Sequence, residues 1–241
     1  MQAVILAGGL GTRLRPRTLT IPKPMVPVLG KPYLYYQLDY LKHQGIGEAI
    51  LLIGYLGDQI RDYFGDGSSL GMALDYSTEK ELLGTGGALK LAEDKIHDDF
   101  FVIYGDSFLP IDYAGFESAF KSAGTEGIIS VYGDPAGVTT VKGNVALSKD
   151  GKVTRYDKKT NDTELIYVEA GVLAFRRDVL RRIPPGRIVS LENDVYPDLI
   201  GERQLSGYIT AQRFFDIGTE SRIKDMEAWL RHDYLKNAVS R

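Results

Sequence analysis

The densest group of residues able to handle negative charge lies near the start of the chain, in Gly8-Gly9-Leu10-Gly11-Thr12-Arg13-Leu14-Arg15-Pro16. The glycines of this segment let backbone N–H groups approach a polyphosphate without a Cβ in the way. Arg13 can hold phosphate oxygens with its forked guanidinium, and Lys23 adds a compact positive charge further along. Pro22 and Pro24 restrict the backbone on both sides of Lys23, which indicates a lysine held in place rather than a freely solvated one.

Two common phosphate-binding motifs do not account for this loop. A P-loop requires Gly-Lys-Ser/Thr at its end, and the chain has Thr12-Arg13 instead. The dinucleotide fingerprint requires a further glycine where Leu14 stands. The segment therefore predicts a phosphate-binding loop of another type, and the alternative is a glycine-rich turn whose arginines are solvated.

Asp106 and Asp216 each stand where an apolar, strand-like run ends. Asp106 follows residues 100–104 and a glycine, and Asp216 follows two phenylalanines and precedes a helical segment. Magnesium prefers one or two carboxylates together with waters and phosphate oxygens. Taken singly, each aspartate is typical of a turn, but the pair beside a phosphate loop predicts a magnesium site.

Apolar runs and helical segments alternate through the first part of the chain. In order, the expected strands and helices are 2–7, 34–41, 49–53, 57–64, 72–76, 85–93 and 100–104. This alternation predicts an α/β fold with a Rossmann-like, doubly wound, mixed but mainly parallel sheet. Ligands of such sheets bind beyond the carboxyl ends of the strands. The site should therefore involve the loop after Ala7, the loop between Tyr76 and Gly87, and Gly105-Asp106.

The later part of the chain has a different character, with few helices between its expected strands. These strands are 128–132, 145–147, 152–156, 166–175, 208–210 and 213–215. Helices are expected over 191–200, with Ser190 as N-cap, and after Thr219. We expect a single domain over residues 1–241, with a nucleotide-binding half at about 1–125 and a mixed-strand half at about 126–241 that closes over a second ligand.

The composition excludes several classes of protein. Of the 241 residues, 25% are charged and 44% hydrophobic, which is typical of a globular chain. The 29 basic and 32 acidic residues give a net charge of −3, so no broad surface for nucleic acid is expected. The absence of cysteine excludes disulfides, zinc–thiolate sites and thiol nucleophiles. No apolar run approaches the roughly 18 residues of a membrane span, so we expect a cytoplasmic protein with no membrane partner.

Further segments resemble the motifs of one enzyme family, in that family's order. Residues 6–14 together with Pro22-Lys23-Pro24-Met25 resemble the motif of the sugar-1-phosphate nucleotidyltransferases, also called nucleotide-sugar pyrophosphorylases. Four later segments resemble the remaining family motifs: 83–88, 105–106, 168–171 and 216–219. The ordered set is far more specific than any one motif, and it spans nearly the whole chain. Within the family, the chain looks most like the heptose-1-phosphate guanylyltransferases.

The resemblance implies a magnesium-assisted transfer of a nucleotidyl group from a nucleoside triphosphate to a sugar 1-phosphate, with pyrophosphate leaving. Arg13 would stabilise the pyrophosphate, and Lys23 would neutralise the α-phosphate and the incoming sugar phosphate. Asp106 and Asp216 would hold Mg²⁺. The residues that would bind the nucleotide are Leu6, Ala7, Gly8, Gly9, Gly11, Thr12, Glu79 and Gly84.

The same resemblance implies a sugar-phosphate site formed by Glu169, Gly171 and a lysine. Glu169 lies inside the apolar run 166–175, where a carboxylate needs a partner, and either a sugar diol or a structural hydrogen bond would serve. The family often has Glu-Lys-Pro where this chain has Asp157-Lys158-Lys159. Lys158 or Lys159 would therefore bind the sugar phosphate, and the alternative is a charged hairpin turn.

The sequence leaves the substrates and the oligomeric state open. Glu79 could accept hydrogen bonds from a guanine edge, which favours GTP with a heptose or hexose 1-phosphate. It could equally face solvent, because its charged neighbours indicate an exposed turn. The alternatives are a uridylyl- or cytidylyltransferase that acts on N-acetylmuramate 1-phosphate, another sugar phosphate or phosphocholine, and a regulatory module that binds nucleotide without turnover. Tyr33, Tyr35, Tyr36 and Tyr40 follow one helical segment and fit either core packing or a homo-oligomer interface.

Overall fold

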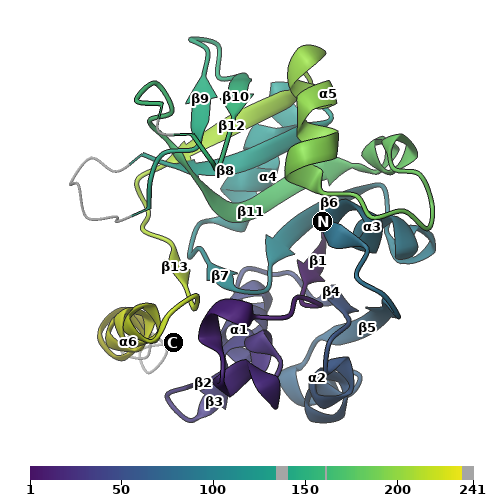
Figure 1. The fold of residues 1–241 in the computed structure, drawn as a ribbon, viewed down its shortest axis with the longest axis vertical. Helices are drawn as coiled ribbons and strands as arrows, with labels where there is room; N and C mark the ends of the chain where they lie inside the picture. The colour runs from purple at the N-terminus through teal and green to yellow at the C-terminus, as the bar shows by residue number, and fades with distance from the viewer. Residues whose placement is uncertain (134–140, 161, 235–241) are drawn as a thin grey trace.

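A seven-stranded sheet runs through the centre of the molecule (Figure 1). The computed structural model describes residues 1–133, 141–160 and 162–234. Across the sheet the strands are β12 (Leu205–Thr210), β8 (Gly127–Tyr132), β11 (Val168–Arg176), β6 (Asp99–Tyr104), β1 (Gln2–Leu6), β4 (Glu48–Ile53) and β5 (Ala73–Thr78). The strands β6, β1, β4 and β5 are parallel, and β11 is antiparallel to both of its neighbours. The mixed, mainly parallel sheet expected from the sequence is confirmed.

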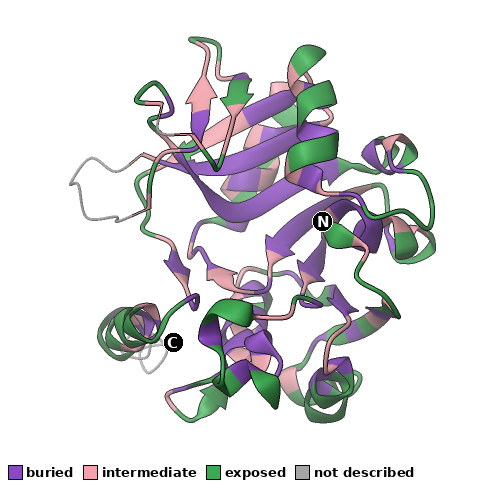
Figure 2. Ribbon diagram, viewed as in Figure 1, coloured by how far each residue is buried: buried purple, intermediate pink, exposed green. Residues whose placement is uncertain are grey.

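The central strands are buried because their residues are apolar on both faces. Nearly every residue of β1, β6, β8 and β11 is buried, whereas the edge strand β5 mixes exposed and buried residues (Figure 2). A fully buried aliphatic or aromatic side chain contributes about 1.5–3 kcal/mol of hydrophobic stabilisation. These runs therefore hold the sheet rigidly and fix where its strand ends lie.

Helices cover both faces of the sheet. The helices α1 (Tyr33–His43), α2 (Gly57–Phe64) and α4 (Tyr113–Ala123) contribute apolar residues to one core. The helices α3 (Gly84–Leu91) and α5 (Tyr196–Gly201) contribute to the other. Neighbouring residues of β1 divide between the two cores, Ile5 in the first and Val4 in the second, so the cores lie on opposite faces. The doubly wound arrangement is confirmed, and no helix within the described ranges is long and apolar enough to cross a membrane.

Helix α4 is absent from the elements expected from the sequence. Glycine and serine inside the segment lower its intrinsic helix propensity. The helix depends instead on Phe116 and Phe120, which lie one turn apart and are buried against the sheet. Asp112 caps its start by accepting a hydrogen bond of 3.0 Å from the backbone of the first turn.

A third apolar cluster joins helix α6 (Glu220–Trp229) to the glycine-rich segment of residues 8–16, which is called the glycine loop below. The helix begins after Thr219, whose side chain accepts from a backbone N–H as expected for an N-cap. Its Ile223 and Met226 belong to one buried cluster with Leu14 and Tyr33. Tyr33 and Tyr36 are buried, so core packing accounts for these two tyrosines. In the described part of the chain, three small strand pairs lie outside the seven-stranded sheet: β2 (Pro27–Val28) with β3 (Lys31–Pro32), β7 (Ser107–Phe108) with β13 (Phe215–Asp216), and β9 (Val145–Leu147) with β10 (Val153–Tyr156).

Gly105 lets the ends of β1 and β6 approach closely. Its N–H donates to the carbonyl oxygen of Leu6 at 2.9 Å, and a Cβ on Gly105 would lie 2.5 Å from that oxygen. We expect Gly105→Ala to lower the free energy of unfolding by about 2 kcal/mol, because one strand end must shift. Chemical denaturation measures the loss. Gly47→Ala is the control, because a Cβ there meets nothing within 4 Å; equal losses in both variants would contradict this explanation.

Candidate active site

A cavity of about 510 Å³ lies at the carboxyl ends of β1, β4 and β6. Leu6, Leu52 and Tyr104, at or next to the last residues of these strands, form part of its wall. This is where ligands of doubly wound sheets bind. The wall brings together the following residues singled out in the sequence: Leu6, Ala7, Gly8, Gly9, Gly11, Thr12, Arg13, Lys23, Glu79, Gly84 and Asp106.

The glycine loop is held by contacts on its inner side. Gly11 adopts a left-handed conformation with φ of 61° and begins the 3₁₀ turn Thr12–Leu14. The Gly11 carbonyl accepts from the Thr18 hydroxyl at 2.8 Å and from the Leu14 N–H at 3.0 Å. Leu14 is buried and Arg13 is exposed, so the loop is anchored while the guanidinium stays open to a ligand.

Lys23 is held in place, as its flanking prolines indicate. The side chain is 10% exposed, and its Nζ donates to Oδ2 of Asp106 at 2.5 Å. A 3₁₀ turn over Lys23–Met25 fixes the backbone, with the Met25 N–H donating to the Pro22 carbonyl at 2.8 Å. A fixed ammonium beside the glycine loop can neutralise a phosphate without an ordering step.

The second aspartate reaches the first through a short strand pair. Asp216 in β13 pairs with Ser107 in β7, and the Ile217 N–H donates to the Asp106 carbonyl at 3.1 Å. The segments that contain Asp106 and Asp216 therefore lie side by side at one end of the sheet. The Asp216 carboxylate accepts from Nη1 of Arg222 at 2.8 and 3.0 Å and from the Gly218 N–H at 2.8 Å.

The two carboxylates fit a magnesium ion by their chemistry. Magnesium uses one or two protein carboxylates and completes its coordination with waters and phosphate oxygens. Among the residues that the structure describes, no group of three or more His, Cys, Asp or Glu side chains could hold a metal. A cation would therefore depend on ligand oxygens, and it would share Asp106 with Lys23 and Asp216 with Arg222.

Glu79 lies against the glycine loop at the cavity. Its Oε2 accepts from the Leu83 N–H at 2.9 Å, and a Cβ on Gly8 would collide with its Oε1. Burial raises the pKa of Glu79, and the hydrogen bond from Leu83 offsets part of that rise. A carboxylate oxygen can accept more than one hydrogen bond, so Glu79 keeps acceptor capacity toward the cavity.

Gly84 has a packing role that its sequence context did not reveal. Its φ is +74°, and a Cβ would lie 2.5 Å from the carbonyl oxygen of Val189. Val189 accepts from the Gly86 N–H and donates to the Leu83 carbonyl, both at 2.8 Å. The glycines at the start of α3 therefore join that helix to the segment before α5, in addition to lining the cavity.

Four predicted site residues are not part of the cavity wall but lie beside it: Asp216, Lys158, Glu169 and Gly171. Val172 of β11 pairs with Ile103 of β6, so residues 169 and 170 run past the end of β6. A Cβ on Gly171 would lie 2.6 Å from Cβ of Ser107, which follows Asp106. The Lys158 Nζ lies 3.6 Å from Oε2 of Glu169.

Glu169 has structural partners on both of its carboxylate oxygens. Tyr196 donates to Oε1 at 3.0 Å, and the Tyr156 hydroxyl donates to Oε2. The side chain is 2% exposed, and burial raises its pKa although Lys158 and the tyrosine hydroxyls act in the opposite direction. These partners satisfy the carboxylate, and contact with a sugar diol stays a prediction.

Of the two candidate lysines, Lys158 is the one beside Glu169. Its side chain is 50% exposed, and its Nζ also donates to Oε1 of Glu192 at 3.1 Å. Lys159 is exposed, and its backbone N–H donates to Asp157 at 2.7 Å, as in a turn. Of the two candidates, Lys158 is therefore the lysine whose ammonium lies next to Glu169, at the edge of the cavity.

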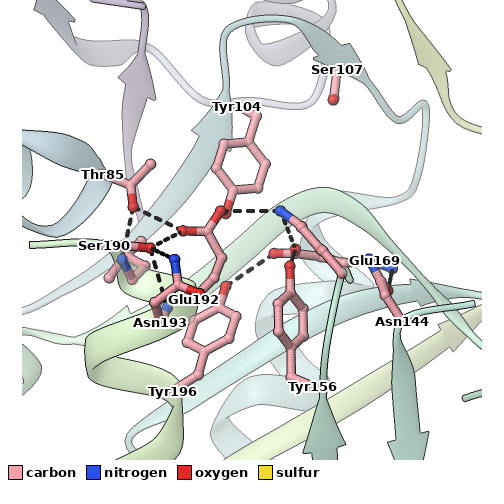
Figure 3. A network of polar contacts seen from close by, with 12 residues as sticks. Thr85, Tyr104, Ser107, Asn144, Tyr156, Glu169, Ser190, Glu192, Asn193 and Tyr196 are labelled. Atoms are coloured by element: carbon pink, nitrogen blue, oxygen red, sulfur yellow. Dashed lines mark hydrogen bonds and ion pairs between the residues drawn. The ribbon is translucent and has the colours of Figure 1, made fainter. Parts of the chain in front are cut away.

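Glu192 was missed by the sequence reasoning. It accepts hydrogen bonds from Thr85, Ser190, Tyr104 and Lys158 (Figure 3). The sequence shows only an acidic residue in the first turn of an expected helix, which is ordinary at helix N-termini. That helix is confirmed as a π-helical turn over Leu191–Val195 followed by α5, with Ser190 as the N-cap.

A mixed, mainly parallel sheet with helices on both faces and a glycine loop after its first strand defines an α/β protein of the Rossmann-like type. The chain matches the family described as "Nucleotidyl transferase" over residues 2–231, and it belongs to that family. This membership confirms the resemblance found in the sequence.

Individual relatives within the family are also similar to this chain. The chain is 37% identical over 225 residues to the mannose-1-phosphate guanylyltransferase of Mycobacterium tuberculosis, covering 91% of this chain and 61% of that protein. It is 49% identical over 112 residues to the D-glycero-alpha-D-manno-heptose 1-phosphate guanylyltransferase of Campylobacter jejuni, covering 46% of this chain and 50% of that protein. The chain thus spans only part of the length of these relatives.

The crystal structure of HddC from Yersinia pseudotuberculosis has a closely similar fold. It superposes with a TM-score of 0.80 at 31% identity, covering 94% of this chain and 98% of HddC. HddC complexed with GMP-PN superposes with a TM-score of 0.77, covering 93% and 96% of the two chains.

Proposed function

We propose that the chain transfers a nucleotidyl group from a nucleoside triphosphate to a sugar 1-phosphate, which yields a nucleotide sugar and pyrophosphate. The observation that carries this proposal is the convergence of Arg13, Lys23 and Asp106 on one cavity whose rim is the glycine loop. The names of the relatives support it. Residues 1–125 would bind the nucleotide, and residues 126–241 would bind the sugar phosphate.

The reaction needs little covalent chemistry from the protein. A phosphate oxygen of the sugar 1-phosphate attacks the α-phosphorus in line, its new P–O bond forms, and the bond to pyrophosphate breaks. The attacking phosphate is already ionised at neutral pH, so no general base is required. Positioning and neutralisation of charge supply the catalysis.

The charged residues in and beside the cavity have separate roles in this transfer. Lys23 neutralises the α-phosphate and the incoming phosphate, and Arg13 holds the departing pyrophosphate. Asp106 and Asp216 would hold Mg²⁺, which supplies further neutralisation of phosphate charge when it is bound. Lys158 would bind the phosphate of the sugar, and Glu169 and Gly171 would lie beside its hydroxyls.

We propose GTP as the nucleotide, with a heptose or hexose 1-phosphate as the acceptor. Glu79 supports this choice, because a carboxylate at the cavity can accept from the N–H groups of a guanine edge. The guanylyltransferase names of the relatives and the GMP-PN complex of HddC support it as well.

Pyrophosphate release with Mg²⁺ tests the proposal directly. Each of four nucleoside triphosphates is combined with mannose, heptose and N-acetylmuramate 1-phosphates and with phosphocholine. We expect release with GTP and a heptose or mannose 1-phosphate. Release only with UTP or CTP would contradict the proposed base. Tight triphosphate binding without release for any pair would indicate a regulatory module instead of an enzyme.

A further inference from the structure

A polar cluster beside the cavity is built around one ammonium group. The Lys158 Nζ lies 3.1 Å from Oε1 of Glu192 and 3.6 Å from Oε2 of Glu169. It also lies 5.6 Å from the ring centroids of Tyr104 and Tyr156. Figure 3 shows Glu192 and Glu169 reaching this cluster from different elements. The Tyr104 hydroxyl is directed at Glu192, and the hydroxyls of Tyr156 and Tyr196 are directed at Glu169.

The two carboxylates of the cluster have different environments. Both oxygens of Glu192 accept hydrogen bonds. Oε2 accepts from Thr85 at 3.0 Å and from Ser190 at 2.9 Å. Oε1 accepts from Tyr104 and from Lys158, both at 3.1 Å. Burial alone would raise the pKa of Glu192, but Lys158, the backbone N–H of Glu192 itself and Ser190 lower it to about 2. Glu192 is therefore an anion at neutral pH with its hydrogen-bonding capacity largely used inside the protein.

Glu192 is fixed to the wall of the nucleotide cavity. Thr85 and Tyr104 both line that cavity, and both donate to Glu192. The Thr85 hydroxyl also accepts from the Leu191 N–H at 2.8 Å, so the backbone next to Glu192 is attached to the start of α3. The carboxylate is thus a rigid support on the cavity side of Lys158.

The ammonium of Lys158 keeps donors for a ligand. A lysine carries three N–H groups, and Glu192 takes one of them at hydrogen-bond distance, whereas Glu169 lies at ion-pair distance. Half of the side chain is exposed. Without a support, a lysine on its flexible four-carbon stem must be ordered when a ligand binds, and the loss of rotamer entropy weakens binding.

We propose that Glu192 is a positioning residue for the acceptor phosphate: it holds the Lys158 ammonium beside the cavity, where the phosphate of the sugar is to bind. The inference rests on the proposed function and extends it to a residue that acts only through Lys158. A nearby carboxylate also repels a phosphate. The direction in which acceptor binding changes when the charge of Glu192 is removed therefore distinguishes placement of the ammonium from repulsion. If placement dominates, removal of the charge weakens acceptor binding, and if repulsion dominates, removal strengthens it.

The test measures protection of Lys158 from acetic anhydride, followed by peptide mass spectrometry, in a titration with mannose 1-phosphate. This readout does not require turnover. We expect protection in the wild-type protein. In Glu192→Gln the concentration for half protection should rise roughly tenfold, the weight of one hydrogen bond to a charged group. Absence of protection in the wild type, or an unchanged or lower half-protection concentration in Glu192→Gln, would overturn the inference.

Asn193→Ala is the matched control. It removes the Nδ2 donor to Oγ of Ser190 at 3.0 Å in the same turn, and it leaves the four donors to Glu192 in place. We expect no change in the protection of Lys158. If Asn193→Ala weakens protection as much as Glu192→Gln, the effect comes from the turn rather than from the contact between Glu192 and the ammonium, and the inference fails.

Kinetics distinguish this inference from the proposed function. Where the wild type releases pyrophosphate, Glu192→Gln should raise the acceptor KM with little change in the KM for the triphosphate. In a Lys158→Met background, Glu192→Gln should not raise the acceptor KM further, because the ammonium through which Glu192 acts is absent. Protection of Lys158 without any pyrophosphate release would overturn the proposed function while the acceptor site stands.

Discussion

Replacement of Arg13 by alanine is expected to lower the turnover number by about three orders of magnitude, the range seen when an arginine that stabilises phosphoryl-transfer charge is lost. The guanidinium lies at the cavity, and its Nη1 would be 3.5 Å from a Cβ on Gly218, next to the Asp216 loop. From there it can reach the β- and γ-phosphates of a bound triphosphate. The KM for the acceptor should change much less, because the interaction grows as pyrophosphate departs.

The fold should tolerate this change, because Arg13 is exposed and Leu14 anchors the turn. Rapid-quench measurement of pyrophosphate formation gives the turnover number, and thermal denaturation checks stability. Arg17→Ala is the matched control, since Arg17 lies in the next turn and forms a surface ion pair of 3.4 Å with Glu220. Near-normal turnover in Arg13→Ala would remove the leaving-group role from this residue.

The second large effect is expected for Asp216→Asn. Loss of a magnesium carboxylate should reduce magnesium-dependent turnover by roughly 100-fold or more, since a bound metal contributes several kcal/mol to the transition state. The asparagine keeps an acceptor for the Gly218 N–H but loses its ion pair with Arg222. That pair is partly exposed, so the free energy of unfolding should fall by only about 1 kcal/mol.

Binding of Mn²⁺ in the presence of GTP, followed by electron paramagnetic resonance, gives a readout separate from turnover. The affinity should fall in Asp216→Asn. Asp225→Asn should leave it unchanged, because Asp225 pairs with Arg213 at 3.0 Å on the surface of α6. A variant that loses stability but keeps both Mn²⁺ affinity and turnover would show that Asp216 is a structural residue.

The part of the site that could be predicted is the part that is continuous in the sequence. The loop Gly8–Arg13 follows an apolar strand directly, so its position at a strand end follows from local pattern alone. Lys23 is confined by its two proline neighbours, which is also a local effect. Asp106 follows β6 in the same way, separated from it only by Gly105.

The part that could not be predicted depends on contacts between distant segments. Glu192 lies 107 residues from Thr85, 88 from Tyr104 and 34 from Lys158 along the chain, and no spacing rule relates them. The glycines at the start of α3 suggest a ligand loop, yet Gly84 and Gly86 also contact the backbone of Val189. The choice between Lys158 and Lys159 likewise required knowledge of which side chain meets Glu169.

The sequence by itself determined the order of the strands and of the helices other than α4, the glycine loop after the first strand and the charged residues near strand ends. These features follow from hydrophobic periodicity and local backbone restriction. Tertiary structure alone decided that Asp106 and Asp216 share one end of the sheet through β7 and β13. It also decided that Lys158 is supported by Glu192 and that Glu169 is enclosed by tyrosines. These arrangements arise from packing between segments far apart in the chain, so no single segment of the sequence specifies them.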